Sequence, residues 1–198
     1  MNIVFDLGGV VFVWRPDLLI AKVFSDNRTR GMVAADLLSH PDWAELDRGC
    51  IEKEEAVSRA AARSGIAADK IRELLNLVPD SLVPIQETIS LISRLKTAGH
   101  RLFVLSNMHH DSANHLEKTY PIWDQFEGVV FSCREKLVKP QPEIFRLLIN
   151  RYHLEPKETV FIDDTRVNLT AAQSLGLIPI HFSNALACEK ELADLTRG

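Results

Sequence analysis

The residues best suited to chemistry stand beside short apolar runs of the sequence. Asp6 follows the run 3–5 and precedes a glycine pair, while Ser106-Asn107 and Asp163-Asp164 each follow a later run and Lys139 lies in a loop between them. Such runs, rich in β-branched and aromatic residues, predict buried strands. Because the carboxyl ends of parallel strands meet at one edge of a sheet, we expect a hydroxyl group, an ammonium group and three carboxylates around one small volume.

This set of groups favours phosphoryl transfer. The carboxylate of Asp6 can act as a nucleophile and form a covalent acyl intermediate. Two carboxylates from different strands and a backbone carbonyl suit Mg²⁺, which would offset the repulsion between Asp6 and an incoming phosphate. Lys139 adds a positive point charge, and Ser106 with nearby backbone N–H groups could bind phosphate oxygens. Each residue also has a plainer reading as a turn or helix cap, or as a solvated loop lysine.

The elements that position these residues alternate regularly in the later part of the chain. Helical patterns end at Gly99 and Gly176, and another helix opens at Pro142. Strands are predicted over 102–105, 129–131, 160–162 and 178–182, the last at an edge of the sheet because it contains Pro179. Strands that alternate with helices indicate a parallel sheet built from βαβ units.

The segment 15–83 breaks this alternation. It contains no convincing strand, and helical patterns occupy 18–24, 32–38, 53–63 and 71–78, with Pro41, Gly49 and Gly65 as separators. The sequence therefore predicts an α/β protein: a Rossmann-like parallel sheet core formed by residues 1–14 and 84–198, with a helical cap domain inserted at 15–83.

Composition excludes several classes of partner. The chain has 198 residues, 46% of them hydrophobic and 25% charged, and a net charge of −4 that gives no footprint for nucleic acid or an anionic membrane. No stretch approaches the roughly 18 apolar residues of a membrane span, and Asp6 interrupts any signal peptide. Three scattered cysteines without a CxxC pair predict neither disulfides nor zinc, and indicate a cytoplasmic protein. The oligomeric state stays open.

Four motifs in order resemble those of the haloacid dehalogenase-like superfamily. They are FDLGGV at 5–10, LSN at 105–107, KPQPEIF at 139–145 and FIDDTRVN at 161–168. Their spacing, with a helical insertion after the first, is most similar to the small sugar-phosphate phosphatases with a helical cap, including the bacterial glucose-1-phosphate type. The resemblance implies a Mg²⁺-dependent phosphatase that hydrolyses a small phosphorylated metabolite through an aspartyl-phosphate intermediate.

The resemblance also assigns roles to individual residues. It makes Asp6 the nucleophile, with Lys139, Ser106 and Asn107 binding the phosphoryl group. The metal ligands would be Asp6, the backbone oxygen of Gly8 and Asp164. Asp163 would support these ligands from behind or serve as an alternative ligand, and Asn168 would orient the loop.

Gly8 departs from the pattern of most phosphatases in the superfamily, which carry a second aspartate there as general acid and base. Such a group contributes roughly 10²–10⁴-fold. We therefore expect a preference for phosphates with good leaving groups, although the glucose-1-phosphate type also lacks the acid. His109 or His110 could donate the proton instead, or could be ordinary surface or helix-start residues.

Two other functions remain open. A 2-haloacid dehalogenase would share the fold and the nucleophile, but the resemblance implies that such enzymes need no metal and lack the acid at Asp164, so Asp164 favours the phosphatase. A non-catalytic protein that binds phosphate or a metabolite would explain Gly8. Trp14 and Arg15 could line the substrate cleft, and Trp43, Asp47 and Arg48 could contact substrate. Trp14 could instead anchor the core or a hinge, and helix packing would equally explain Trp43, Asp47 and Arg48.

Overall fold

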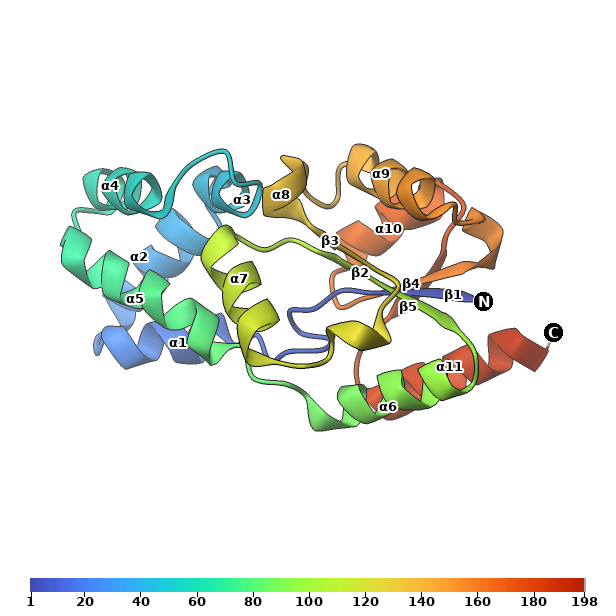
Figure 1. Ribbon diagram of the computed structural model, residues 1–198. Helices are drawn as coiled ribbons and strands as arrows, with labels where there is room; N and C mark the ends of the chain where they lie inside the picture. Colours follow the sequence, from blue (N-terminus) through green and yellow to red (C-terminus); the bar gives the residue numbers. More distant parts are fainter. Residues whose placement is uncertain (198) are drawn as a thin grey trace.

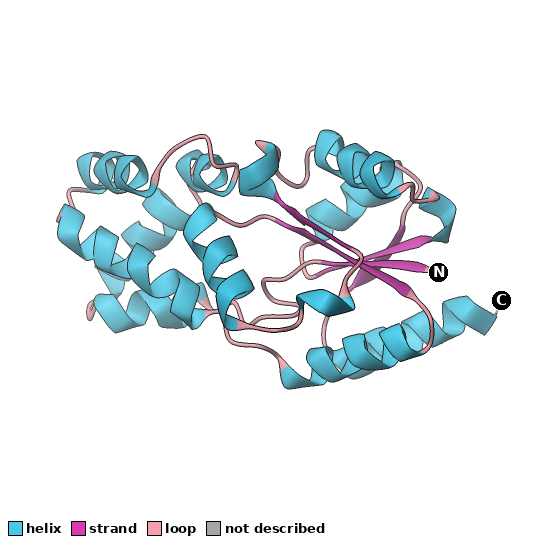
Figure 2. Ribbon diagram, viewed as in Figure 1, coloured by secondary structure: helices cyan, strands magenta, loops and turns pink. Residues whose placement is uncertain are grey.

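A single parallel sheet forms the centre of the protein in the computed structural model, which describes residues 1–197 (Figures 1 and 2). Gly198, the last residue of the predicted core segment, lies outside the described residues. The five strands are β1 (Asn2–Phe5), β2 (Arg101–Ser106), β3 (Gly128–Phe131), β4 (Thr159–Asp163) and β5 (Ile178–His181), in the order β3-β2-β1-β4-β5. The predicted Rossmann-like α/β fold is confirmed, and the strand with Pro179 lies at an edge.

The central strand β1 is held on both sides. Phe5 is in register with Val104 of β2 and with Ile162 of β4, and the Asp6 amide donates to the Ile162 carbonyl at 2.9 Å. All four residues of β1 are buried, as expected for a strand covered on both faces. This register brings the carboxyl ends of the three strands level, so Asp6 emerges between the ends of its neighbours.

Alternate residues of β1 face two separate apolar layers, as the twofold repeat of a strand requires. Ile3 and Phe5 pack in one cluster, where helices α6 (Gln86–Thr97) and α11 (Ala185–Arg197) cover the sheet. Val4 packs in the other, beneath α9 (Pro142–Tyr152) and α10 (Arg166–Ser174). Figure 1 shows the two pairs of helices on opposite sides of the sheet.

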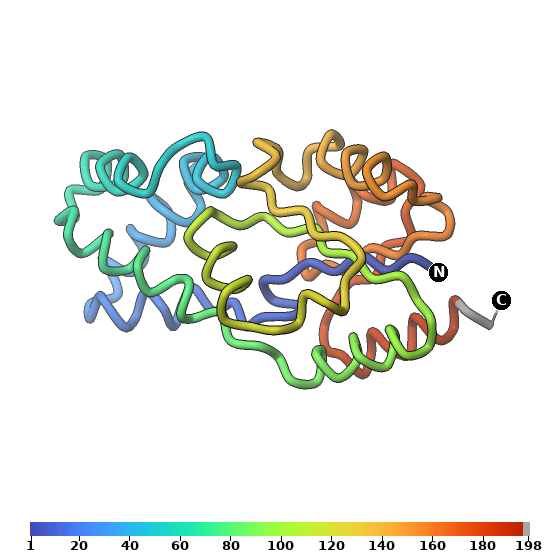
Figure 3. The backbone as a smooth tube through the Cα atoms, viewed as in Figure 1, coloured from blue at the N-terminus to red at the C-terminus, as the bar shows by residue number. Residues whose placement is uncertain are grey.

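The helices between β1 and α6 pack around an apolar cluster of their own, with buried members from Leu19 to Val78. They gather at one end of the molecule, away from the chain termini (Figures 1 and 3). They are α1 (Pro16–Val23), α2 (Asn27–Val33), a π-helical turn (Ala34–Leu38), α3 (Pro41–Asp47), α4 (Lys53–Ser64) and α5 (Ala68–Ser81). Pro41, expected to separate two helices, instead begins one, because a helix's first position needs no N–H donor.

Two adjacent segments connect these helices to the sheet. The Val13 amide donates to the Val83 carbonyl, and the Ile85 amide to the Val11 carbonyl, both at 2.8 Å. Further contacts reach α7 (His110–Thr119) and α8 (Ser132–Glu135), where the Ser132 hydroxyl donates to the Asp47 carbonyl at 2.5 Å. Short 3₁₀ turns at Trp123–Gln125 and Pro156–Glu158 complete the described elements.

Cys50 is exposed, and Cys133 and Cys188 are buried, all three as free thiols. Within residues 1–197, none of the helices has the length and apolar character needed to cross a membrane. The cytoplasmic location stays a prediction from composition.

Candidate active site

Lys139 lies between two carboxylates at the carboxyl edge of the sheet. Its Nζ is 2.8 Å from Asp6 Oδ1 and 2.7 Å from Asp163 Oδ2, and the Lys139 side chain is only 1% exposed. The Leu7 amide also donates to Asp6 Oδ1, at 2.7 Å. Asp6 lies more than a hundred positions before Lys139 and Asp163 in the sequence, and the parallel register of the strands brings the three together.

Burial and charge shift the ionisation of both partners. Burial raises the pKa of Asp6 to about 6, a shift that Lys139 opposes and Asp163 reinforces. Burial alone would lower the pKa of Lys139, but the charges of Asp6 and Asp163 and their hydrogen bonds outweigh it and raise that pKa. Lys139 is therefore held as a cation, and the neighbouring Asp6 carboxyl group loses its proton at about pH 6.

Asp163 is fully occupied by the protein. It accepts the Thr165 amide at 2.8 Å, the Asn168 side-chain amide at 3.1 Å and the Lys139 ammonium, and it has no exposed surface. These bonds use both of its oxygens, so Asp163 fixes the lysine and the loop rather than facing the cleft.

Asp164 is exposed and lines the cleft beside Asp6. Its pKa is raised, first by partial burial and then by the charge of Asp163. Oxygens of Asp6, Asp163 and Asp164 all lie within 4.8 Å of one another. Three carboxylates around one ammonium leave an excess of negative charge and hard oxygen atoms, which fits a divalent cation such as Mg²⁺.

The two residues after β2 have different surroundings. Asn107 accepts the Lys139 amide at 2.8 Å and donates to the Lys139 carbonyl at 2.9 Å, so its side chain holds the backbone of the lysine. The Ser106 hydroxyl is buried and has no hydrogen-bond partner among the described residues. A buried hydroxyl without a partner carries a desolvation cost, which a bound phosphate oxygen would relieve.

The glycine pair after Asp6 gives close packing at one position and open space at the other. Gly9 has a φ of +77°, and a Cβ there would lie 2.3 Å from Asp164 Oδ2, so only glycine fits. At Gly8 the nearest neighbour of a Cβ would be Trp14 Cβ at 3.8 Å, an ordinary contact. A side chain at position 8 would therefore have room at the cleft.

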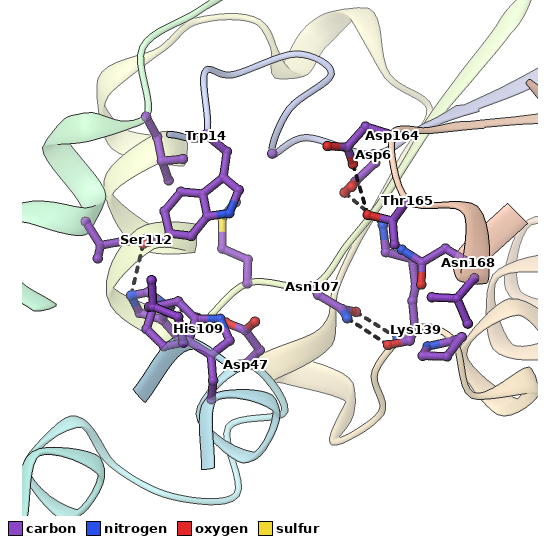
Figure 4. A pocket seen from close by; sticks show the side chains of 18 residues that line it. Asp6, Trp14, Asp47, Asn107, His109, Ser112, Lys139, Asp164, Thr165 and Asn168 are labelled. Atoms are coloured by element: carbon purple, nitrogen blue, oxygen red, sulfur yellow. Dashed lines mark hydrogen bonds and ion pairs between the residues drawn. The ribbon is translucent and has the colours of Figure 1, made fainter. Parts of the chain in front are cut away.

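The cleft itself has a volume of about 470 Å³ and two unlike sides. Figure 4 shows Asp6, Asp164, Lys139 and Asn168 on one side, and Trp14, Asp47, His109 and Ser112 on the other. His109 thus faces the cleft, whereas His110 does not line it. Of the other residues considered from the sequence, Trp14, Trp43 and Asp47 line the cleft, whereas Arg15 and Arg48 do not. Sequence reasoning missed Ser112. Its position three residues after His109, on one helix face, was the available signal.

Comparison with known proteins identifies the class that this fold and site define. The haloacid dehalogenase-like hydrolase family model matches residues 1–176. The chain belongs to this family and is a hydrolase, which confirms the resemblance at the level of the superfamily.

The chain is similar to several members along most of its length. It is 27% identical over 192 residues to the sesquiterpene phosphatase astK of Aspergillus oryzae, covering 97% of this chain and 94% of the relative. A HAD family enzyme from Bacteroides thetaiotaomicron, solved as a magnesium complex, superposes with a TM-score of 0.70 at 25% identity and 92% coverage of both chains. A HAD-like hydrolase from Porphyromonas gingivalis gives a TM-score of 0.74 at 25% identity, covering 100% of this chain and 98% of that one.

Proposed function

We propose that the protein is a Mg²⁺-dependent phosphatase that hydrolyses small phosphomonoesters through a phosphorylated Asp6. The observation that carries the proposal is the buried Asp6 carboxylate paired with Lys139 and adjoined by Asp164. A phosphatase relative and a family enzyme that binds magnesium support it.

Asp6, Asp164 and the Gly8 carbonyl would hold the metal, which supplies positive charge to the phosphoryl oxygens when bound. Asp163 is not assigned as a ligand because Lys139, Thr165 and Asn168 engage its oxygens. The excess of carboxylates over ammonium groups at this edge is the feature that fits a divalent ion.

The residues of the chain divide the reaction between them. An oxygen of Asp6 attacks phosphorus, the bond to the ester oxygen breaks, and that oxygen leaves with the electron pair. Lys139 and the Ser106 hydroxyl bind the phosphoryl oxygens as charge develops on them. Water then attacks phosphorus, which releases inorganic phosphate and restores the Asp6 carboxylate.

Asn107 is assigned a positioning role within the phosphate-binding set, since it holds the backbone on both sides of Lys139. The sugar phosphate implied by the resemblance stays a prediction, as does the absence of a nucleic-acid partner. The substrate would in any case be a small phosphorylated metabolite.

The test is phosphate release from a panel of phosphomonoesters, with Mg²⁺ and with EDTA. We expect activity that requires Mg²⁺ and that falls by roughly 10³-fold or more in Asp6→Asn. Asp17→Asn, at an exposed aspartate paired with Arg15, is the matched control and should keep full activity.

Two results would favour the other functions. Release of halide from 2-haloacids without phosphatase activity would identify a dehalogenase. Tight binding of fluoroberyllate with Mg²⁺, but no turnover of any ester, would identify a non-catalytic binding protein. If Asp6→Asn remained as active as wild type, the assignment of the nucleophile would be wrong.

A further inference from the structure

The side of the cleft that faces away from Lys139 is largely apolar. Trp14 and Trp43 stack with ring centroids 6.1 Å apart and planes 29° from parallel. With them the cleft is lined by Leu38, Val78, Leu82 and Met108. Met108 lies between β2 and α7, and the other side chains come from the helices between β1 and α6 or from the loops that adjoin those helices. All of them share one cavity with Asp6 and Lys139 (Figure 4).

The polar groups on this side are already engaged with one another. His109 Nε2 is 3.0 Å from the Ser112 hydroxyl, and His109 Nδ1 is 3.4 Å from Asp47 Oδ1. His109 is 5% exposed, and its ring meets that of Trp43 edge to face at 5.9 Å. Both ring nitrogens of His109 therefore have protein neighbours, which leaves the Asp47 carboxylate and the Ser112 hydroxyl as the polar groups that this side offers to a ligand.

A sugar would fit such a wall poorly. Hydroxyl groups that face the indole rings or the aliphatic side chains would lose water without gaining a hydrogen bond, which is unfavourable for a buried polar group. An alkyl or aryl group would bury apolar area at the same surface. Val167, at the opposite rim, adds an apolar side chain that is 56% exposed.

The cleft, at about 470 Å³, has room for an organic group beside the phosphate.

We propose that this cleft selects phosphate monoesters whose organic group is apolar, an alkyl or aryl group, over phosphorylated sugars. The inference rests on the proposed phosphatase function for the phosphate half of the cleft. Trp14 and Trp43 are the specificity-determining residues.

The kinetic test compares n-octyl phosphate with glucose 6-phosphate, because both leave as primary alkoxides and differ only in the organic group. Acetyl phosphate, which has almost no organic group, reports on the chemistry alone. We expect kcat/KM for n-octyl phosphate to exceed that for glucose 6-phosphate at least tenfold. Equal values, or a preference for the sugar, would overturn the proposal.

Variants locate the effect in the cleft. Trp43→Ala should lower kcat/KM for n-octyl phosphate by about 10–200-fold, chiefly through KM, and leave acetyl phosphate unchanged. Leu38→Ser tests the same wall if Trp43→Ala fails to fold, and it should also lower kcat/KM for n-octyl phosphate. Leu186→Ala, at an exposed leucine of α11 outside this cleft, is the control and should leave kcat/KM unchanged for both substrates. If Trp43→Ala and Leu38→Ser lowered kcat/KM for n-octyl phosphate and acetyl phosphate equally, the wall would have no role in substrate selection.

A binding measurement separates this inference from the proposed activity. Calorimetry with Mg²⁺ and non-hydrolysable phosphonates should show n-octylphosphonate binding at least tenfold tighter than methylphosphonate. If acetyl phosphate were not hydrolysed, the proposed phosphatase function would fail, yet the phosphonate pair would still test the cleft. Equal affinities of the two phosphonates would refute the apolar selection even in an active enzyme.

Discussion

Gly8→Asp should convert the protein into a better catalyst for esters with poor leaving groups. The position has no positive φ, and a Cβ would meet Trp14 Cβ at 3.8 Å, so an aspartate can be added without displacing the backbone. Gly8 lines the cleft near Asp6. Its neighbours Asp6, Asp163 and Asp164 would raise the pKa of a new carboxyl group, which favours the protonated form that a general acid requires.

The magnitude follows from this role. A positioned general acid contributes about 10²–10⁴-fold, and its benefit grows with the pKa of the leaving group. We expect kcat/KM to rise by about 10²-fold or more for alkyl phosphates and to change little for 4-nitrophenyl phosphate. Plotted against leaving-group pKa, the rates of wild type should fall steeply and those of the variant should fall less.

Two controls make the result interpretable. Gly8→Asn fills the same space without an ionisable group and should leave the slope steep. Gly9→Ala should instead damage the protein, because the positive φ costs about 1–2 kcal/mol and the new Cβ would collide with Asp164 Oδ2. A wild-type rate that does not depend on leaving-group pKa would refute the reasoning, since the missing acid would then be irrelevant.

Three further predictions concern the network around Lys139. Asp163→Asn removes one of the two carboxylates that contact the buried ammonium group of Lys139. Because Asp6 still pairs with the ammonium group, the loss in unfolding free energy should be that of hydrogen bonds to a charged group, about 1.5–3 kcal/mol, measured with urea; a loss below about 1 kcal/mol would contradict the account. Asn107→Ala removes two hydrogen bonds to the Lys139 backbone and should lower kcat roughly tenfold to a hundredfold while the protein stays folded. An unchanged kcat would show that Asn107 does not position Lys139 for the reaction. Because burial raises the pKa of Asp6 from 3.8 to about 6, its charge should destabilise the metal-free fold by up to about 3 kcal/mol. This penalty is absent below pH 3.8 and complete above about pH 6. In EDTA, the unfolding free energy of the Asp6→Asn variant should therefore rise relative to that of wild type as the pH increases between these values. A difference in unfolding free energy that stays constant with pH would argue against the shifted pKa.

The sheet was predictable because its strands carry local signals. Ile3–Phe5 and Val160–Ile162 are apolar runs beside Gly or Asp residues, and Pro179 correctly indicated an edge. The helix α3 was missed because Pro41 reads equally well as a helix breaker or as a first helical residue, and only tertiary packing decides between them. Pro79 lies inside α5, in its last turn, which a pattern of propensities would also not predict.

The candidate site was predictable only in part. The clustering of Asp6, Lys139 and Asp164 follows from the parallel topology, which the alternation of elements reveals. The hydrogen bonds of Asn107 to the Lys139 backbone depend on loop geometry that no spacing encodes. The same holds for the cleft wall, where Leu38, Val78 and Leu82 are ordinary apolar residues of a helical pattern until the helices are placed.

The central position of β1 has a consequence for how the protein is made. The strand is synthesised before both of its partners, β2 and β4, and the Asn2 side chain bonds to a residue 157 positions later. At roughly 5–20 residues per second, a ribosome needs about 10–30 s to supply the last of these partners. The helices from α1 to α5 contact one another within one continuous segment, so they can assemble during that interval while β1 waits with unpaired edges. The candidate site can therefore form only after β4 has been synthesised, and a ribosome that stalls before β4 leaves an apolar strand open to aggregation.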